Sequence, residues 1–111
     1  MRADIPIAAQ IVQFGHACLE AGHRFRQPET SCNLVVLSVP SEKHLHAAVA
    51  RIECIGLRCE IFYEPDNELG YTAVCTEPVS GPARRIFRRF QLWQFARGDR
   101  APPRPPLVAI L

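Results

Sequence analysis

The sequence predicts a single α/β domain, and two observations lead to that prediction. First, 111 residues that are 48% hydrophobic suffice for one compact core but are too few for two domains. Second, stretches with helical apolar spacing, at about residues 6–22, 41–55 and 80–90, are separated by apolar runs of strand length. Strands that alternate with helices imply a two-layer or three-layer α/β arrangement.

The first helix is expected at about residues 6–22, with Asp4 as a cap, Pro6 in the first turn and Gly22 at the end. One helical face is expected to be buried, because apolar residues recur at i, i+4, i+7 and i+11: Ile7, Ile11, Phe14 and Cys18. The same stretch carries Gln10, Gln13 and His16. Their spacing alone does not decide whether they form a functional site or a solvated helix face.

The middle of the chain predicts a strand, a helix and a second strand. Residues 33–39 form an apolar run typical of a central strand, which Pro40 ends. Ser41 offers an N-cap for a helix that ends at Gly56 and buries Leu45, Ala48, Val49, Ile52 and Ile55. We expect residues 33–39 to pair in parallel with a strand at 57–64 across this helix.

The last part of the domain predicts a strand at 71–77 and a third helix. The turn sequence "PDNELG" before that strand allows a hairpin with residues 57–64. The third helix begins near Ser80 and Pro82 and is expected to turn four residues inward: Ala83, Ile86, Phe87 and Phe90. Its opposite face carries two i, i+4 pairs of like charge, Arg84, Arg85, Arg88 and Arg89. Because these arginines repel one another, they indicate a polyanion partner or else a merely solvated face.

Several classes of function lack support in the sequence. No long apolar run and no basic-then-apolar leader is found, so neither a membrane span nor export is indicated, and a cytoplasmic location is expected. The five cysteines are scattered without a CxxC pair and are expected to be reduced and mostly buried. No cofactor and no metal is expected, since there is no GxGxxG, no phosphate loop and no cluster of metal ligands.

Three stretches together resemble one known family. They are "RADIPIAAQIVQFGHA", "NLVVLSVPSEKHLHAAVARIECIGL" and "YEPDNELGYTAVCTEPVSGPARRIFRRFQLW". In this order they resemble the type II (archaeal and eukaryotic-type) peptidyl-tRNA hydrolases, and more closely that family's short bacterial relatives, over about residues 2–93. The resemblance implies a three-layer α/β/α sandwich around a four-stranded mixed sheet, usually a homodimer, that hydrolyses the ester between a peptide and tRNA.

The resemblance also implies site residues. Arg2 and Asp4 match the arginine and aspartate that follow the family's first strand, and Arg2 joins the four arginines of the third helix as a candidate RNA contact. Gln13 and His16 match the glutamine and histidine of the first helix, Thr72 matches a threonine of the last strand, and either Glu64 or Asp66 supplies the acidic residue. Ala9 stands where the family has a lysine.

The family's first, central strand has no counterpart before Arg2. We therefore expect residues 1–96 to form the domain, 97–106 a proline-rich extended linker, and the apolar residues 107–111 to fill the empty strand position, in the same chain or swapped into a partner. The alternative is a misplaced start codon or a truncated chain. For function, the sequence leaves two classes open: a peptidyl-tRNA hydrolase of weak activity, acting on tRNA, and a non-catalytic binding or dimeric structural module on the same fold.

Overall fold

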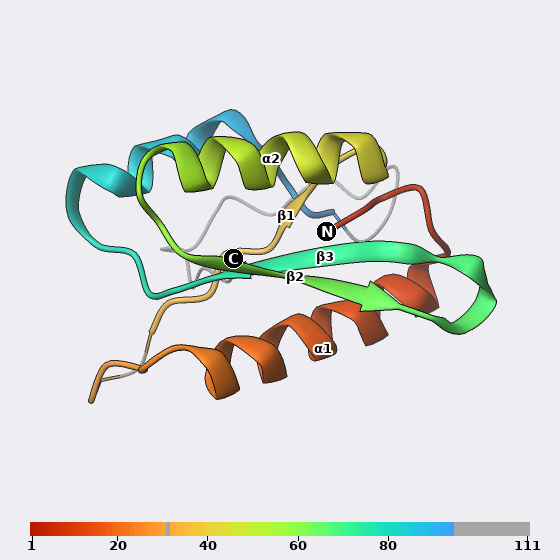
Figure 1. Ribbon diagram of the computed structural model, residues 1–111, viewed down its shortest axis with the longest axis horizontal. Helices are drawn as coiled ribbons and strands as arrows, with labels where there is room; N and C mark the ends of the chain where they lie inside the picture. Colours follow the sequence, from red (N-terminus) through yellow and green to blue (C-terminus); the bar gives the residue numbers. More distant parts are fainter. Residues whose placement is uncertain (31, 95–111) are drawn as a thin grey trace.

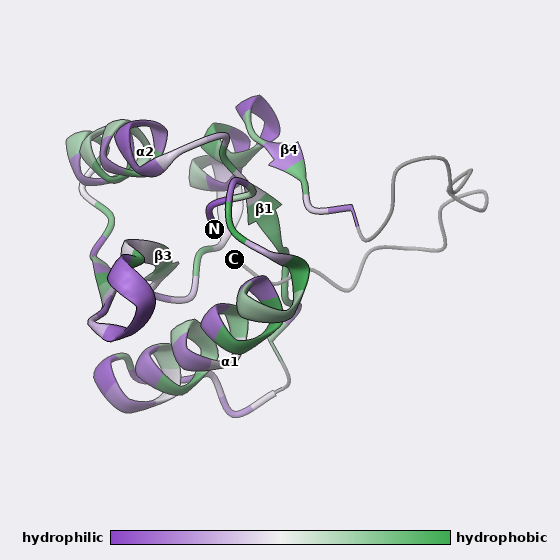
Figure 2. Ribbon diagram, turned by 90° about the vertical axis from the view of Figure 1, so that its right-hand side faces the viewer, coloured by the Kyte–Doolittle hydropathy of each residue, from purple (hydrophilic) through white to green (hydrophobic). Residues whose placement is uncertain are grey.

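The computed structural model describes residues 1–30 and 32–94 of this chain. Two helices cover opposite faces of a β-hairpin, as Figures 1 and 2 show from two directions. Helix α1 spans Ile7–Arg24 and lies on one face, and helix α2 spans Glu42–Cys54 and lies on the other. The chain is therefore an α/β protein, as predicted.

Among residues 1–30 and 32–94 the strands form two small antiparallel sheets, and the expected four-stranded mixed sheet is not seen there. Strand β2 (Cys59–Glu64) pairs with β3 (Gly70–Thr76), and β1 (Leu37–Ser38) pairs with β4 (Gln91–Leu92). The hairpin allowed by "PDNELG" is thus present, closed by the short 3₁₀ helix η1 (Asp66–Glu68), in which Asn67 adopts a φ of 53°. The expected parallel pairing between residues 33–39 and 57–64 is wrong, because β2 and β1 each pair with a later strand instead.

The beginning of the chain lies between the facing edges of the two sheets. Arg2 bridges to Val39 in parallel, and the amide of Ala3 donates to the Val39 carbonyl at 2.8 Å. On the other side, the Arg2 amide donates to the Thr72 carbonyl at 2.9 Å. Residues 1–3 therefore connect the two sheets at one end only.

Helix α1 is rotated by roughly a quarter turn from the predicted orientation, so Phe14 and Cys18 are half-buried while the other two predicted core residues are exposed. Its buried residues are Gln10, Gln13 and Ala17, whereas Ile7 and Ile11 are 42% and 51% exposed. The helix also begins and ends differently: Pro6 is the N-cap, without a side-chain hydrogen bond, and the helix continues past Gly22 to Arg24. Asp4 does not cap it because its carboxylate binds the Arg2 guanidinium instead.

Helix α2 agrees better with its sequence pattern. The Ser41 side chain accepts a hydrogen bond from the His44 amide, as an N-cap should, and Gly56 has the left-handed φ of 84° expected after the helix. Leu45, Ala48 and Ile52 are buried. Ile55 is not, because it lies at the C-cap and is 49% exposed.

The third helix is a 3₁₀ helix, η2 (Gly81–Arg89), which lies beside α2 (Figure 1). Phe87 is buried and Phe90 is half-buried, so the predicted inward face is correct although the helix type differs. Phe90 joins a core cluster around Val39, Leu45 and Ala48, and a second cluster packs Ala17 and Phe25 against β3 on the opposite face.

The predicted linker and apolar segment, residues 97–106 and 107–111, lie outside the described residues. Within residues 1–30 and 32–94, no helix is long and apolar enough to cross a membrane.

Candidate functional site

The polar face of α1 meets the hairpin in a buried hydrogen-bonded network. The Thr72 hydroxyl, fully buried on β3, donates to Oε1 of Gln13 at 2.6 Å. Nε2 of Gln13 then donates to Oε2 of Glu64 at 2.9 Å. The amide orientation of Gln13 follows from this pattern, because a hydroxyl can donate to the amide oxygen while a carboxylate can only accept. Gln13 therefore joins the two strands to the helix through both ends of its amide.

His16 lies beside this network at the surface. It lies one turn after Gln13, and its Nε2 is 3.9 Å from Oε2 of Glu64. Its ring stacks on Phe62 of β2, with centroids 4.6 Å apart and planes 9° apart. The side chain of His16 is 40% exposed whereas that of Glu64 is 11% exposed. Water can thus reach the imidazole, while the carboxylate behind it is shielded.

Glu64 is held as a carboxylate. The hydrogen bond from Gln13 lowers the pKa of Glu64, and the Asp66 amide, which donates to Oε1 at 3.1 Å, lowers it further. Desolvation opposes these two hydrogen bonds with a smaller effect, and the nearby imidazole lowers the pKa least. Of the two acidic candidates, Glu64 is therefore the one in the network, while Asp66 contributes its backbone amide and has an exposed side chain.

Arg2 lies apart from this network in contacts of its own. Its guanidinium donates to both carboxylate oxygens of Asp4 and to the carbonyl oxygens of Leu69 and Tyr71, at 2.5 and 3.2 Å. It also reaches Glu42 of α2 at 3.3 Å, and its side chain is only 13% exposed. Arg2 thus fastens the start of the chain to β3 and α2, and its contact with RNA stays a prediction.

The four arginines of η2 are all exposed. They lie on the side of the hairpin that α2 covers, whereas Gln13 and His16 belong to α1 on the opposite side (Figure 1). The structure therefore brings together four predicted site residues, Gln13, His16, Glu64 and Thr72, and places Arg84, Arg85, Arg88 and Arg89 elsewhere.

Gln10 is a buried polar residue whose role the spacing argument left open. Its Nε2 donates to the Ile5 carbonyl at 2.8 Å and its Oε1 accepts from the indole of Trp93 at 2.6 Å. Gln10 therefore ties α1 to the N-terminal loop and to the end of β4. The available signal was its i, i+3 spacing to Gln13, which places both amides on one helical face.

The remaining candidates for metal or thiol chemistry do not form a site. Within residues 1–30 and 32–94, no three His, Cys, Asp or Glu side chains are grouped as a metal would require. The cysteines are free, and burial raises the pKa of the Cys59 and Cys75 thiols to about 11, which makes both poor nucleophiles. Cys32 and Cys54 are exposed, contrary to the expectation of mostly buried thiols.

The site thus consists of an accessible imidazole, a shielded carboxylate behind it, and an amide and a hydroxyl that fix the carboxylate in place. Comparisons with protein-family models, with curated proteins and with solved structures find no match to this chain.

Proposed function

We propose that this chain is a peptidyl-tRNA hydrolase-like esterase of weak activity. The observation that supports the proposal is the convergence of Gln13, His16, Glu64 and Thr72, which come from three elements and were expected together on other grounds. An imidazole backed by a carboxylate is a chemical arrangement that can activate water for attack on an ester carbonyl.

His16 is the general base in this proposal. Its exposed imidazole accepts a proton from a water molecule that attacks the ester carbonyl, and the Glu64 carboxylate stabilises the imidazolium that results. The separation of 3.9 Å between His16 Nε2 and Glu64 Oε2 exceeds hydrogen-bonding distance, so the pair must tighten when substrate binds. Gln13 and Thr72 are positioning residues, since they touch Glu64 or each other and are buried away from solvent.

The weak activity follows from the missing lysine. Ala9, one helical turn before Gln13, offers no cation to stabilise the negative charge that develops on the carbonyl oxygen. Removal of one such donor typically lowers the rate by about 10²–10³. The Arg2 guanidinium does not replace the lysine in this proposal because its donors are taken by Asp4, Glu42 and two carbonyl groups.

The tRNA would be held in part by the exposed arginines of η2. Each arginine that neutralises a phosphate adds roughly 0.9 to the slope of the logarithm of the tRNA association constant against the logarithm of the salt concentration. If all four do so, replacing them should make this slope shallower by about 3–4. Such a substrate would also place the protein in the cytoplasm. The three-layer sandwich with a four-stranded sheet belongs to the same proposal and requires a further strand between β1 and β3.

The test is the release of an N-blocked amino acid from tRNA by the folded protein. We expect slow turnover that falls by about 10²-fold or more in a His16→Gln variant, which removes the base. His23→Gln is the matched control, because His23 is an exposed histidine near the end of the same helix, and its turnover should equal that of the unaltered protein. Absence of turnover above buffer in folded protein, or equal turnover in His16→Gln, would contradict the proposal.

A second candidate function, a non-catalytic dimeric or binding module, is favoured by a different observation. The outer face of α1 exposes four large apolar residues, by 42 to 73%: Ile7, Ile11, Val12 and Leu19. Apolar patches of this kind mark interaction surfaces, and a homodimer could cover this one. Light scattering on the unaltered protein and on Ile11→Lys tests whether α1 forms a dimer, because a dimer formed through α1 becomes monomeric in the variant. A dimer that shows no turnover in the ester assay favours the module over the enzyme.

A further inference from the structure

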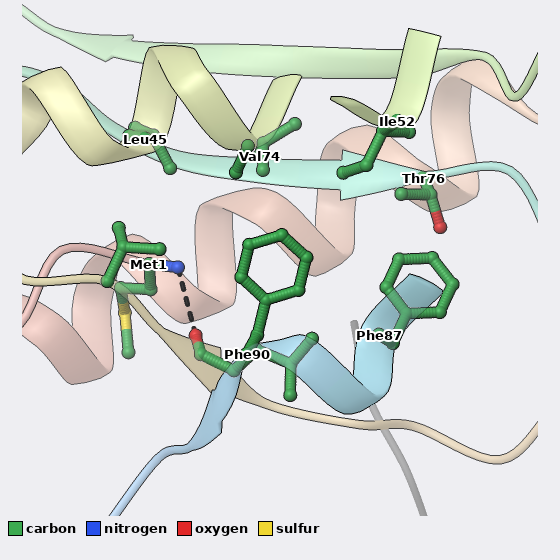
Figure 3. Close-up of a pocket in the computed structure, with 10 residues that line it drawn as sticks. Met1, Leu45, Ile52, Val74, Thr76, Phe87 and Phe90 are labelled. Carbon is green, nitrogen blue, oxygen red and sulfur yellow. Dashed lines mark hydrogen bonds between the residues drawn. The ribbon is translucent and has the colours of Figure 1, made fainter. Parts of the chain in front are cut away.

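An apolar groove separates the two sheets beyond the point where residues 1–3 connect them. It has a volume of about 390 Å³, part of which is open to solvent. Figure 3 shows its walls: Val74 and Thr76 of β3 with Ile52 of α2 along one side, and Phe87 and Phe90 along the other. Leu37 of β1 also lines it, and Met1 stands at one end, where its amino group donates to the Leu37 carbonyl at 3.0 Å.

The edge of β3 that faces the groove carries unpaired backbone groups. The Glu77 amide donates to the Arg58 carbonyl, so in an antiparallel ladder the amides of Cys75 and Ala73 also turn toward β2. Val74 and Thr76 alternate with them and turn their N–H and C=O groups to the opposite edge. Within residues 1–30 and 32–94, no backbone hydrogen bond satisfies these groups, although the Arg2 amide pairs with Thr72 on the same edge.

The edge of β1 that faces the groove is paired with Met1 at Leu37 and Val39 and is open before Leu37. The Leu37 carbonyl accepts from Met1, and the Val39 amide donates to the Met1 carbonyl at 2.9 Å, so Leu37 and Val39 face the groove. By alternation, Val35 turns its backbone the same way, while Val36 faces β4 and accepts from the Trp93 amide at 2.9 Å. The groove therefore has the two polar edges and the apolar lining that a central β-strand requires, and helices cover both faces of that position.

We propose that residues 107–111 of the same chain fill this groove as a strand between β1 and β3. The five residues, Leu-Val-Ala-Ile-Leu, are apolar without alternation, which is the pattern of a strand buried on both faces. Their number suits the space, because β3 continues for only four residues beyond Thr72. A strand here would join the two small sheets into one.

The position of Gln94 favours the chain's own segment over that of a second copy. The chain runs antiparallel to β1 through β4, and the Trp93 contact with Val36 brings it to the open end of the groove. From there the groove lies two strand spacings away, about 10 Å. Residues 95–106, at about 3.1 Å each, reach about 37 Å when extended, so the chain only has to pass around β1 and return. Residues 107–111 would then run parallel to β1 and end beside Met1.

Nuclear magnetic resonance on the full, unaltered chain tests this directly. We expect nuclear Overhauser contacts from residues 108–110 to Val74 and Val35, and slow hydrogen exchange at the Val74 and Thr76 amides. Random-coil exchange in residues 108–111 with no such contacts would overturn the proposal. So would contacts that appear only between differently labelled molecules, because these would assign the groove to a second copy.

A pair of proline variants tests the role of the segment. Ala109→Pro removes a strand amide and clashes with a central position, so exchange at Val74 and Thr76 should accelerate tenfold or more. Ala101→Pro is the control, since it makes the same change outside the segment, and exchange should stay as in the unaltered protein. Unchanged exchange in Ala109→Pro would count against the strand, and if this variant unfolds, the contacts in the unaltered chain still decide.

Discussion

Replacement of Thr72 by valine isolates the buried contact on which the candidate site depends. Valine keeps the shape of threonine but removes the hydroxyl that donates to Gln13 Oε1 at 2.6 Å. Thr72 is 0% and Gln13 2% exposed, so water cannot replace the lost donor without a rearrangement. A buried acceptor left without a partner costs about 1–3 kcal/mol, and for a domain of this size each kcal/mol lowers Tm by roughly 4–8 °C. We therefore expect Thr72→Val to reduce the free energy of unfolding by about 1–3 kcal/mol.

Urea denaturation of a double-mutant cycle measures the contact itself. In Gln13→Met/Thr72→Val both partners are gone, so no buried group of this pair is left without its partner. The loss of unfolding free energy in the double variant should therefore be at least about 1 kcal/mol smaller than the sum of the losses in the two single variants. Thr76→Val is the control: its hydroxyl donates to the adjacent Glu77 carbonyl at the end of the strand, and its loss should cost less. Additive single effects, or a change below about 0.5 kcal/mol in Thr72→Val, would show that the network is not energetically coupled.

Three further predictions concern charge. Burial lowers the pKa of the Met1 amino group from 8.0 to about 6. The unfolded chain then binds more protons between these values, so the free energy of unfolding should decrease as the pH falls from 8 to 6, by up to roughly 3 kcal/mol. An NMR titration of Met1 measures the pKa directly. Because the pKa of Glu64 is lowered from its ordinary 4.5, its carboxylate stabilises the fold above that pH and loses this effect in acid. Glu64→Gln should accordingly weaken the dependence of the free energy of unfolding on pH in the acid range, as measured by chemical denaturation at several pH values. Arg2→Lys should destabilise the fold by about 1–3 kcal/mol, since an ammonium cannot reproduce a guanidinium that binds Asp4 and the Tyr71 carbonyl together, and a calorimetric Tm equal to that of the unaltered protein would contradict this.

The elements with local signals were predicted well from the sequence. Helix α2 has its cap at Ser41, its left-handed residue at Gly56 and three of its five predicted core residues buried, because each feature depends on neighbours within a few positions. The hairpin likewise follows from the turn between its strands. Strand β1 is shorter than the apolar run that contains it, since β4 supplies a ladder of only two residues.

The face that α1 buries could not be predicted from its periodicity. Apolar spacing identifies a stripe but not what covers it, and here the partners of the polar face are distant in sequence: Gln13 binds residues 51 and 59 positions away. Gln13, His16, Glu64 and Thr72 were nominated by resemblance rather than by spacing, and the structure places them in contact. Gln10 and the groove beside Met1 depend on the tertiary arrangement, which no local pattern contains.

The rotated orientation of α1 has a consequence for how the protein folds. The helix has two stripes that can dock on the hairpin: the more apolar one with Ile7 and Ile11, which hydrophobic collapse favours, and the one with Gln10, Gln13 and Ala17, which the native structure buries. We expect the apolar stripe to compete early in folding for the same sheet surface. The native docking is then selected later, when the Gln10 and Gln13 amides find their directional partners. On this reasoning the energy landscape is locally frustrated at α1. Replacing Gln10 and Gln13 together should therefore let the helix dock in more than one orientation while the protein stays compact. The expected sign is broadened NMR signals along α1.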